Sequence, residues 1–156
     1  MHYIPQHNDF VVIAIGDTNR RSEVDNILRK KQVNFGSVIH PTAMISTSSH
    51  WGEGAILAPH VVVTADVTVG RHTHMNIATS VGHDVKIGNF VTLSSHTDVT
   101  GGCEVGDFGF LGSGACILPN YKIAPKSRIG AGCVVTRSVS KATVFAPPIS
   151  KKVVFK

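Results

Sequence analysis

Apolar residues recur at every sixth position of this sequence, from Ile39 to Val135, without a gap. The series has 17 members and spans 17 × 6 = 102 positions of the 156-residue chain. Neither an α-helix, which repeats every 3.6 residues, nor a single strand, which repeats every 2, gives such a period. It is typical of a parallel β-helix, in which each hexapeptide supplies one short strand and one corner. The members are Ile39, Ile45, Trp51, Leu57, Val63, Val69, Met75, Val81, Ile87, Leu93, Val99, Val105, Leu111, Ile117, Ile123, Ile129 and Val135.

Two further sets of positions keep the same register. Mostly small side chains stand four residues after each member of the series, where they let the chain turn a corner while the core stays filled. Glycine directly follows several members, where we expect the corner to need an unusual backbone conformation. Three hexapeptides make one coil, so between five and six coils are expected from the series. These glycines are Gly52, Gly70, Gly82, Gly88, Gly106, Gly112 and Gly130.

The segment before the repeat predicts one strand and one helix. Residues 11–16 are apolar and end in glycine, which is typical of a buried strand. Asp17 or Thr18 can cap a helix that runs to about Val33. A strand and a helix alone are too little for an independent nucleotide-binding domain.

These patterns divide the chain into three parts. They are an N-terminal strand–helix segment of residues 1–37, an all-β solenoid of residues 38–140 and a C-terminal tail of residues 141–156. The tail carries two consecutive prolines and then a basic, strand-prone stretch. We expect it to cap the last coil, because an open solenoid end exposes unpaired strand edges.

Composition narrows the functions that the chain can carry. Only 16% of its residues are charged and 6% aromatic, and the basic residues do not interleave with aromatic ones, so nucleic-acid binding is not expected. No apolar stretch reaches the length of a membrane span, and the first residues do not resemble a signal peptide. The three cysteines are interpreted as reduced thiols of a cytoplasmic protein, two of them facing the core.

Several motifs together resemble one group of acyltransferases. Besides the hexapeptide register, they are Ala14-Ile15-Gly16-Asp17, the junction from Val38 to Ala43, and Val81-Gly82-His83-Asp84. The combination resembles the bacterial left-handed β-helix sugar acetyltransferases, which N-acetylate nucleotide-linked amino sugars or O-acetylate sialic acid. The resemblance runs from about residue 10 to the C-terminus. It implies a left-handed coil, which the period alone does not reveal because most parallel crossovers are right-handed.

The resemblance implies a catalytic set. His83 matches the general base of the family, and Asp84 matches the acidic residue that raises its basicity. Histidine suits this role because an attacking amine or hydroxyl must lose a proton near neutral pH. Gly101 follows His83 by one coil, 83 + 18 = 101, and matches the glycine whose N–H stabilises the oxyanion of the tetrahedral intermediate.

The resemblance also implies acetyl-CoA as the co-substrate and a homotrimer that binds it between neighbouring prisms. The positions that match acetyl-CoA contacts are Thr92, Gly101, Ser113 and Ala131. Ser113 and Ala131 are also one coil apart, so they form a second column on a different edge of the prism from His83. The formal net charge of +5 suits the phosphates of CoA.

The chain departs from the family pattern in three places. Thr92 stands where the family usually has a second histidine, and His96 lies at a different point of the hexapeptide. The family's N-terminal subdomain is longer, so only Gly16 and Asp17 match its nucleotide-sugar site. Either the chain is a truncated form, or its acceptor is smaller or bound differently. The Gly-x-Pro-Ala motif near the C-terminus appears here as residues 146–149, which leaves the path of the tail open.

The sequence therefore predicts an acetyltransferase that moves an acetyl group from acetyl-CoA to an amino or hydroxyl group of a sugar. The expected acceptor is a nucleotide-linked 4-amino sugar used for surface glycans. The alternative is a non-catalytic scaffold trimer, a pseudoenzyme that has lost the nucleotide-sugar site and does not bind acetyl-CoA. A zinc site is not expected. His60 and His96 are two coils apart, but glycine occupies position 101, where a third histidine would be needed.

Overall fold

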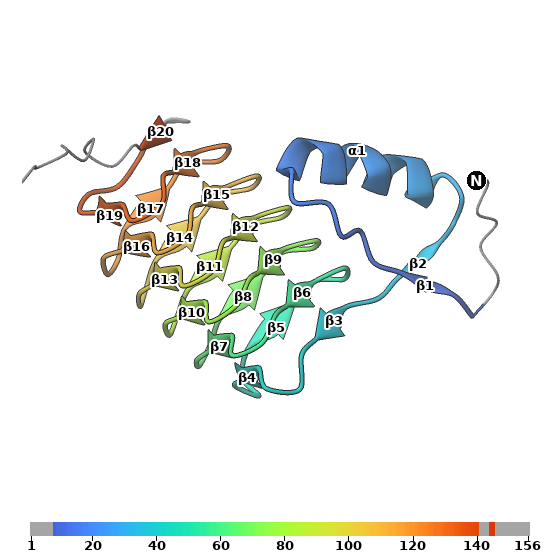
Figure 1. Cartoon of the computed structure of the whole chain (residues 1–156), viewed down its shortest axis with the longest axis horizontal. Helices are drawn as coiled ribbons and strands as arrows, with labels where there is room; N and C mark the ends of the chain where they lie inside the picture. Colours follow the sequence, from blue (N-terminus) through green and yellow to red (C-terminus); the bar gives the residue numbers. More distant parts are fainter. Residues whose placement is uncertain (1–7, 141–143, 146–156) are drawn as a thin grey trace, which may run out of the picture.

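The computed structural model describes residues 8–140 and 144–145. In this range the chain is a left-handed parallel β-helix that follows one short helix (Figure 1), as the six-residue period and the resemblance predicted. Strands β3 to β19 are 17 in number, at three strands per coil, which gives between five and six coils. The strands are β3 Val38–Ile39, β4 Met44–Ile45, β5 His50–Trp51, β6 Ile56–Leu57, β7 Val62–Val63, β8 Thr68–Val69, β9 His74–Met75, β10 Ser80–Val81, β11 Lys86–Ile87, β12 Thr92–Leu93, β13 Asp98–Val99, β14 Glu104–Val105, β15 Phe110–Leu111, β16 Cys116–Ile117, β17 Lys122–Ile123, β18 Arg128–Ile129 and β19 Val134–Val135.

Three parallel sheets form the three faces of the prism. The first face contains β3, β6, β9, β12, β15 and β18, the second β4, β7, β10, β13, β16 and β19, and the third β5, β8, β11, β14 and β17. Each strand pairs with the strand one coil later, as Ser80 does with Asp98. Strand β20, Val144–Phe145, pairs with β18 and extends the first face. The rest of the expected capping tail, residues 141–156, lies outside the described residues.

The core of the prism is the six-residue series. Every member from Leu57 to Val135 is buried, whereas the first three members, in the coil that no earlier coil covers, remain partly exposed. The small residues four places later also point inward, and their hydroxyls are satisfied by the backbone. For example, Thr73 Oγ1 donates to the Gly88 carbonyl at 3.0 Å. Cys103 and Cys133 are buried, as expected from their positions, and Cys116 is partly exposed.

The glycines at the corners have a different cause from the one we expected. Left-handed φ values occur at the third residue after each member of the series from Trp51 to Ile129, and most residues there are not glycine, for example Asp84 at 59°. The glycine directly after the core residue is needed because successive coils touch there. A Cβ on Gly70 would lie 2.5 Å from the Gly88 backbone. Close packing between coils, rather than backbone conformation, therefore excludes a side chain at these positions.

The N-terminal segment consists of β1 (Phe10–Val11), α1 (Thr18–Arg29) and β2 (Asn34–Phe35), with β1 and β2 paired in parallel. Asp17 caps α1, as predicted, since its side chain accepts a hydrogen bond from the Arg20 N–H at 2.9 Å. The helix ends at Arg29 rather than near Val33. Gln32 adopts a left-handed φ of 56°, which is incompatible with a continuing helix. At 12 residues, α1 is also too short to cross a membrane.

Helix α1 packs on the solenoid through charged groups. Asp25 is fully buried and contacts Arg71 at 2.5 Å and the Nε2 of His72 at 2.9 Å. Arg29 also pairs with Asp25 and reaches Glu53. Burial alone would raise the pKa of Asp25, but the hydrogen bond from Arg29 and the nearby positive charges lower it below the usual value. Breaking such a buried network by removing one partner is strongly destabilising.

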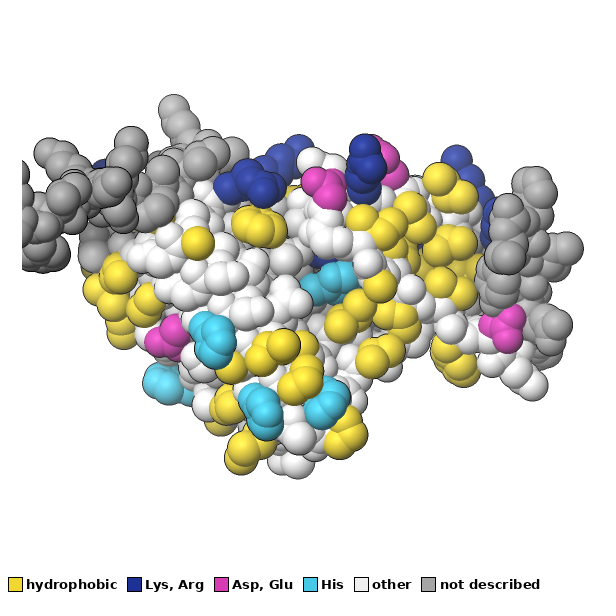
Figure 2. Space-filling view, viewed as in Figure 1, with side chains coloured by type: hydrophobic (Ala, Val, Ile, Leu, Met, Phe, Trp, Pro, Cys, Tyr) yellow, Lys and Arg dark blue, Asp and Glu magenta, His cyan; other side chains and the backbone are white. Residues whose placement is uncertain are grey.

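The apolar residues of α1 face the other way. Val24 and Leu28 line a cavity of about 370 Å³ together with residues 11–15. Figure 2 shows hydrophobic side chains gathered on this part of the surface, next to α1 and the β1–β2 pair. The segment is thus anchored by polar contacts to the β-helix and leaves an apolar face beside the strand.

Candidate active site

His83 and Gly101 meet at the corner between the second and third faces. His83 follows β10, and Gly101 follows β13, one coil later. A Cβ built on Gly101 would lie 2.7 Å from His83 Nε2 and 2.9 Å from its Cε1. The imidazole of His83 therefore occupies the space that the Cβ of any residue other than glycine would need at position 101. The coil-to-coil proximity that the sequence predicted is present, with His83 71% exposed.

Asp84 holds the other side of the same ring. Its Oδ2 lies 2.8 Å from His83 Nδ1, which fits a neutral imidazole that donates from Nδ1 to the carboxylate. In that tautomer the Nε2 lone pair, on the side of Gly101, is free to accept a proton. The left-handed φ of Asp84 is shared by the same turn position in most coils, so it reflects the corner and not a special strain.

The backbone N–H of Gly101 has no acceptor among residues 8–140. Its carbonyl accepts from Asn120 N at 3.0 Å, and the next residue, Gly102, donates to the His83 carbonyl at 2.9 Å. Gly82 keeps the nitrogen uncovered, because a Cβ there would lie 2.6 Å from Gly101 N. A backbone N–H without an acceptor beside a histidine can stabilise a developing oxyanion.

Ser113 and Ala131 form a column on a different edge, between the first and second faces. They follow β15 and β18 and are both exposed, and Gly132, the residue after Ala131, donates from its N to the Ser113 carbonyl at 2.9 Å. His83 and Gly101 thus stack in one column and Ser113 and Ala131 in another, and the second face separates the two columns. Within residues 8–140, Ser113 and Ala131 do not lie next to His83.

Thr92 lies in neither column. It is 4% exposed on the first face, under the N-terminal segment. Its hydroxyl donates to the Gly16 carbonyl at 3.3 Å and accepts from Arg21 at 3.0 Å. Both hydrogen-bonding roles of the hydroxyl are filled within the chain, so the geometry does not favour the predicted contact of Thr92 with acetyl-CoA.

Gly16 and Asp17 form an exposed loop between the segment of residues 11–15 and α1. Asp17 is occupied as the helix cap, whereas Gly16 has no atom within 4 Å of the place where a Cβ would stand. The loop is therefore open to an acceptor on its outer side. Sequence reasoning missed the side chain that holds it, Arg21, which is fully buried and donates to the Ile15 carbonyl at 2.8 Å.

His74 makes the stability of this junction depend on pH. It is buried, its Nδ1 lies 2.9 Å from Arg21, and burial followed by the Arg21 charge lowers its pKa to about 3. Burial also lowers the pKa of His72. In the unfolded chain these histidines have pKa values near 6.5, so they take up protons at a higher pH than in the folded chain. Their contribution to the stability of the folded state is therefore complete above pH 6.5 and is lost as the pH falls toward 3.

We therefore expect the free energy of unfolding to fall on acidification. For His74 alone, the free energy of unfolding should fall by about 1.4 kcal/mol per pH unit below pH 6.5, which amounts to a loss of about 2 kcal/mol by pH 5. His72 should add to this loss. Urea denaturation at pH 7.5, 6 and 5 measures the slope. His74→Gln should reduce it by about one proton, whereas replacement of the exposed His50 by Gln should not. An unchanged slope in His74→Gln would show that this histidine is not the group responsible.

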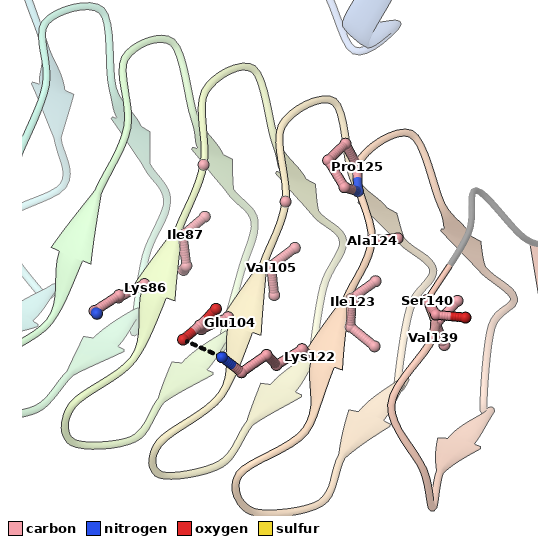
Figure 3. A pocket seen from close by; sticks show the side chains of 12 residues that line it. Lys86, Ile87, Glu104, Val105, Lys122, Ile123, Ala124, Pro125, Val139 and Ser140 are labelled. Carbon is pink, nitrogen blue, oxygen red and sulfur yellow. Dashed lines mark ion pairs between the residues drawn. The ribbon is translucent and has the colours of Figure 1, made fainter.

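The third face carries a groove that contains none of the predicted site residues. It has a volume of about 480 Å³ and lies along β11, β14 and β17, toward the corner next to the first face (Figure 3). Lys86, Glu104 and Lys122 stand in one column, and Glu104 pairs with Lys122 at 3.0 Å. Alternating charges in a cross-strand column are typical of a solvated face. Among the described residues, no group of three or more His, Cys, Asp or Glu side chains is placed to hold a metal ion.

Solved structures similar to this chain include acetyltransferases. WeeI from Acinetobacter baumannii AYE is 30% identical, with a TM-score of 0.86 over 92% of this chain and 71% of that one. Perosamine N-acetyltransferase from Caulobacter crescentus, solved as a His-to-Asn variant with CoA and GDP-perosamine, is 31% identical, with a TM-score of 0.81 over 85% of this chain. The acetyltransferase domain of PglB from Neisseria gonorrhoeae FA1090 is 25% identical, with a TM-score of 0.84 over 89% of this chain and 68% of that one.

The chain belongs to the hexapeptide-repeat sugar acetyltransferases. No protein-family model matches the sequence, so the assignment rests on the structural comparison together with the shared register. This member of the family spans about 62% of the length of the perosamine N-acetyltransferase chain. The β-helix, the His83 corner and the Gly16 loop all lie within its described residues.

Proposed function

We propose that the chain is a subunit of an acetyltransferase that moves an acetyl group from acetyl-CoA to the amino group of a nucleotide-linked sugar. The observation that carries the proposal is the His83 corner, where the ring lies over Gly101 and its Nδ1 is paired with Asp84. His83 is the general base, Asp84 fixes its tautomer, and Gly101 N–H is the oxyanion donor. Similar chains solved with CoA and GDP-perosamine support this substrate class.

The reaction follows from these three groups. The neutral amino group of the sugar attacks the thioester carbonyl while Nε2 of His83 takes one of its protons. The carbonyl oxygen becomes negative and accepts the hydrogen bond of Gly101 N–H. Collapse of the tetrahedral intermediate breaks the C–S bond, and the CoA thiolate leaves with the proton that His83 holds. The products are the N-acetylated sugar and free CoA, and His83 returns to its starting form.

We place acetyl-CoA along the column of Ser113 and Ala131, with Gly101 at the reacting carbonyl, and the sugar nucleotide at Gly16 and Asp17. Thr92 is left out of the CoA site because its hydroxyl is already bonded on both sides. The cytoplasm is the compartment that we propose. The free thiols of Cys103 and Cys116 agree with a reducing environment.

The arrangement of the faces supports a homotrimer. The third face is charged, and α1 covers part of the first. The outward column of the second face lacks Lys and Arg and exposes Met44 (69%) and Val134 (55%). Threefold packing of second faces around one axis would bring the His83 edge of one subunit next to the Ser113 edge of its neighbour. The apolar residues of this face and its two flanking columns favour this assembly over a monomer.

The loop of Gly16 and Asp17, here called the acceptor loop, also requires a neighbouring subunit. Gly16 is bonded to Thr92 on the first face, whereas His83 stands at the corner between the second and third faces, on the opposite side of the prism. A sugar held at Gly16 cannot reach the histidine of its own subunit. We therefore propose that each active site combines the loop of one subunit with His83 and Gly101 of the next.

Mixed trimers test this composite site. His83→Ala removes the base, and Gly16→Glu places a negative charge in the open space beside the loop, so each homotrimer should be inactive toward GDP-perosamine. After co-expression in equal amounts, half of the loops and half of the bases are intact, so about 1/2 × 1/2, or one quarter, of wild-type activity should return. Assay of thiol release measures it. Mixtures as inactive as the two homotrimers would contradict a shared site.

A further inference from the structure

Arg21 is a buried charge that the proposed chemistry does not use. It is on α1, is fully buried, and donates from one terminal nitrogen to the carbonyls of Phe90 and Val91 at 2.8 and 3.0 Å. The other terminal nitrogen donates to the Ile15 carbonyl at 2.8 Å. None of the ion pairs within residues 8–140 includes Arg21. Burial of a guanidinium among neutral acceptors is costly, so it needs a reason other than stability.

The neighbours of Arg21 are matched to a permanent positive charge. His74 presents Nδ1 to it at 2.9 Å, and the lowered pKa of His74 keeps that ring neutral and able to accept. Thr92 Oγ1 accepts from Arg21 at 3.0 Å. Both residues stand on adjacent strands of the first face, β9 and β12, which pair in register. The guanidinium is therefore fixed relative to the β-helix and not only to α1.

The same groups hold two consecutive carbonyls of the acceptor loop. Arg21 binds the Ile15 carbonyl, and Thr92 binds the Gly16 carbonyl at 3.3 Å. Asp17 then caps α1, and Arg21 of this helix also donates to Thr92 Oγ1. The carbonyls of Ile15 and Gly16 are thus both hydrogen-bonded within the chain, while the space next to the Cα of Gly16 is open. A backbone held in this way is organised before a ligand arrives, which reduces the cost of binding.

We propose that Arg21 and Thr92 are positioning residues of the acceptor site, which hold the Ile15–Gly16 backbone against β9 and β12 so that it can bind the sugar nucleotide. The inference rests on the proposed function, because it assigns the loop to the acceptor. Neither residue touches the substrate. Their contribution is to hold the loop in one conformation and at a fixed position beside β9 and β12.

Thr92→Val tests the proposal with little change of shape, since it removes the hydroxyl and keeps the branched side chain. The KM for GDP-perosamine should rise about 2- to 12-fold, the value of one lost hydrogen bond, the one to the Gly16 carbonyl. The kinetic constants for acetyl-CoA should stay the same. Arg21→Lys keeps the charge but offers one nitrogen to five acceptors, so it should raise the same KM further.

Thr79→Val is the matched control. Thr79 is also fully buried and donates to the Ser94 carbonyl at 3.2 Å, in the core and away from the loop. Thr79→Val should lower the melting temperature about as much as Thr92→Val but leave the KM for GDP-perosamine unchanged. Equal KM values in wild type and Thr92→Val would overturn the proposal.

Hydrogen exchange separates this inference from the proposed function. In Thr92→Val, the amides of residues 15–18 should exchange faster than in the wild type, whereas in Thr79→Val they should not. If the wild-type protein acetylates no amino sugar, the proposed function fails, and exchange alone decides whether Arg21 and Thr92 hold the loop. Equal exchange in all three proteins would show that these two residues do not order it.

Discussion

Replacement of His83 by alanine is expected to lower the turnover number for acetyl transfer by about 10²- to 10⁴-fold, the usual contribution of a positioned general base. The structure gives the reason, since Nε2 is the ring nitrogen of His83 that faces Gly101 while Nδ1 is held by Asp84. Because the side chain is 71% exposed, its removal should leave the melting temperature and the oligomeric state unchanged. Thiol release from acetyl-CoA in the presence of GDP-perosamine measures the rate.

His50→Ala is the matched control for this variant. His50 is another exposed histidine in the same β-helix, on the third face and away from both columns. It should transfer acetyl groups at the wild-type rate. Calorimetric titration of His83→Ala with acetyl-CoA should show binding as tight as in the wild type. Turnover of His83→Ala within twofold of His50→Ala would mean that His83 is not the base.

Gly101→Ala is expected to lower turnover by about 10²- to 10³-fold, comparable to removing an oxyanion donor. The added methyl would lie 2.7 Å from His83 Nε2, so the ring must move off its place above the glycine. The exposed imidazole has room to move, at the expense of its contact with Asp84. Ala65 and Ala131 occupy the corresponding corner position in other coils, so the fold accepts a side chain there. Steady-state turnover and the melting temperature together measure the effect.

Gly52→Ala separates an effect on the site from an effect on the fold. Its added methyl would also meet an atom at 2.7 Å, but that atom belongs to the backbone of Arg71. Gly52→Ala should therefore lower the melting temperature and retain turnover, the reverse of Gly101→Ala. If Gly101→Ala transfers acetyl groups at the wild-type rate, the close approach of His83 and Gly101 has no catalytic meaning.

The part of the site that obeys the period could be predicted from the sequence. Because the repeat is uninterrupted, positions one coil apart must stack, which places His83 beside Gly101 and Ser113 beside Ala131. The same arithmetic predicted which side chains form the core. It could not show that Ile39 and Trp51 are partly exposed, since that depends on the absence of a coil before the first one.

Contacts between the N-terminal segment and the solenoid follow no period. Arg21 meets residues 53 and 71 positions away, and the helix face that it shares with Asp25 is buried although both residues are charged. Thr92 shows the consequence. Its place in the family pattern suggested acetyl-CoA, whereas its hydroxyl is bonded to Gly16 and Arg21. One signal was available in the sequence, namely that Arg21 and Asp25 are one helical turn apart.

The most direct test of the account is the release of free CoA thiol when the wild-type protein is mixed with acetyl-CoA and GDP-perosamine. We expect saturable thiol release that requires the amino sugar, with one thiol formed for each sugar acetylated. Absence of thiol release, together with absence of acetyl-CoA binding in a calorimetric titration, would contradict it. That result would favour a non-catalytic scaffold built on the same β-helix.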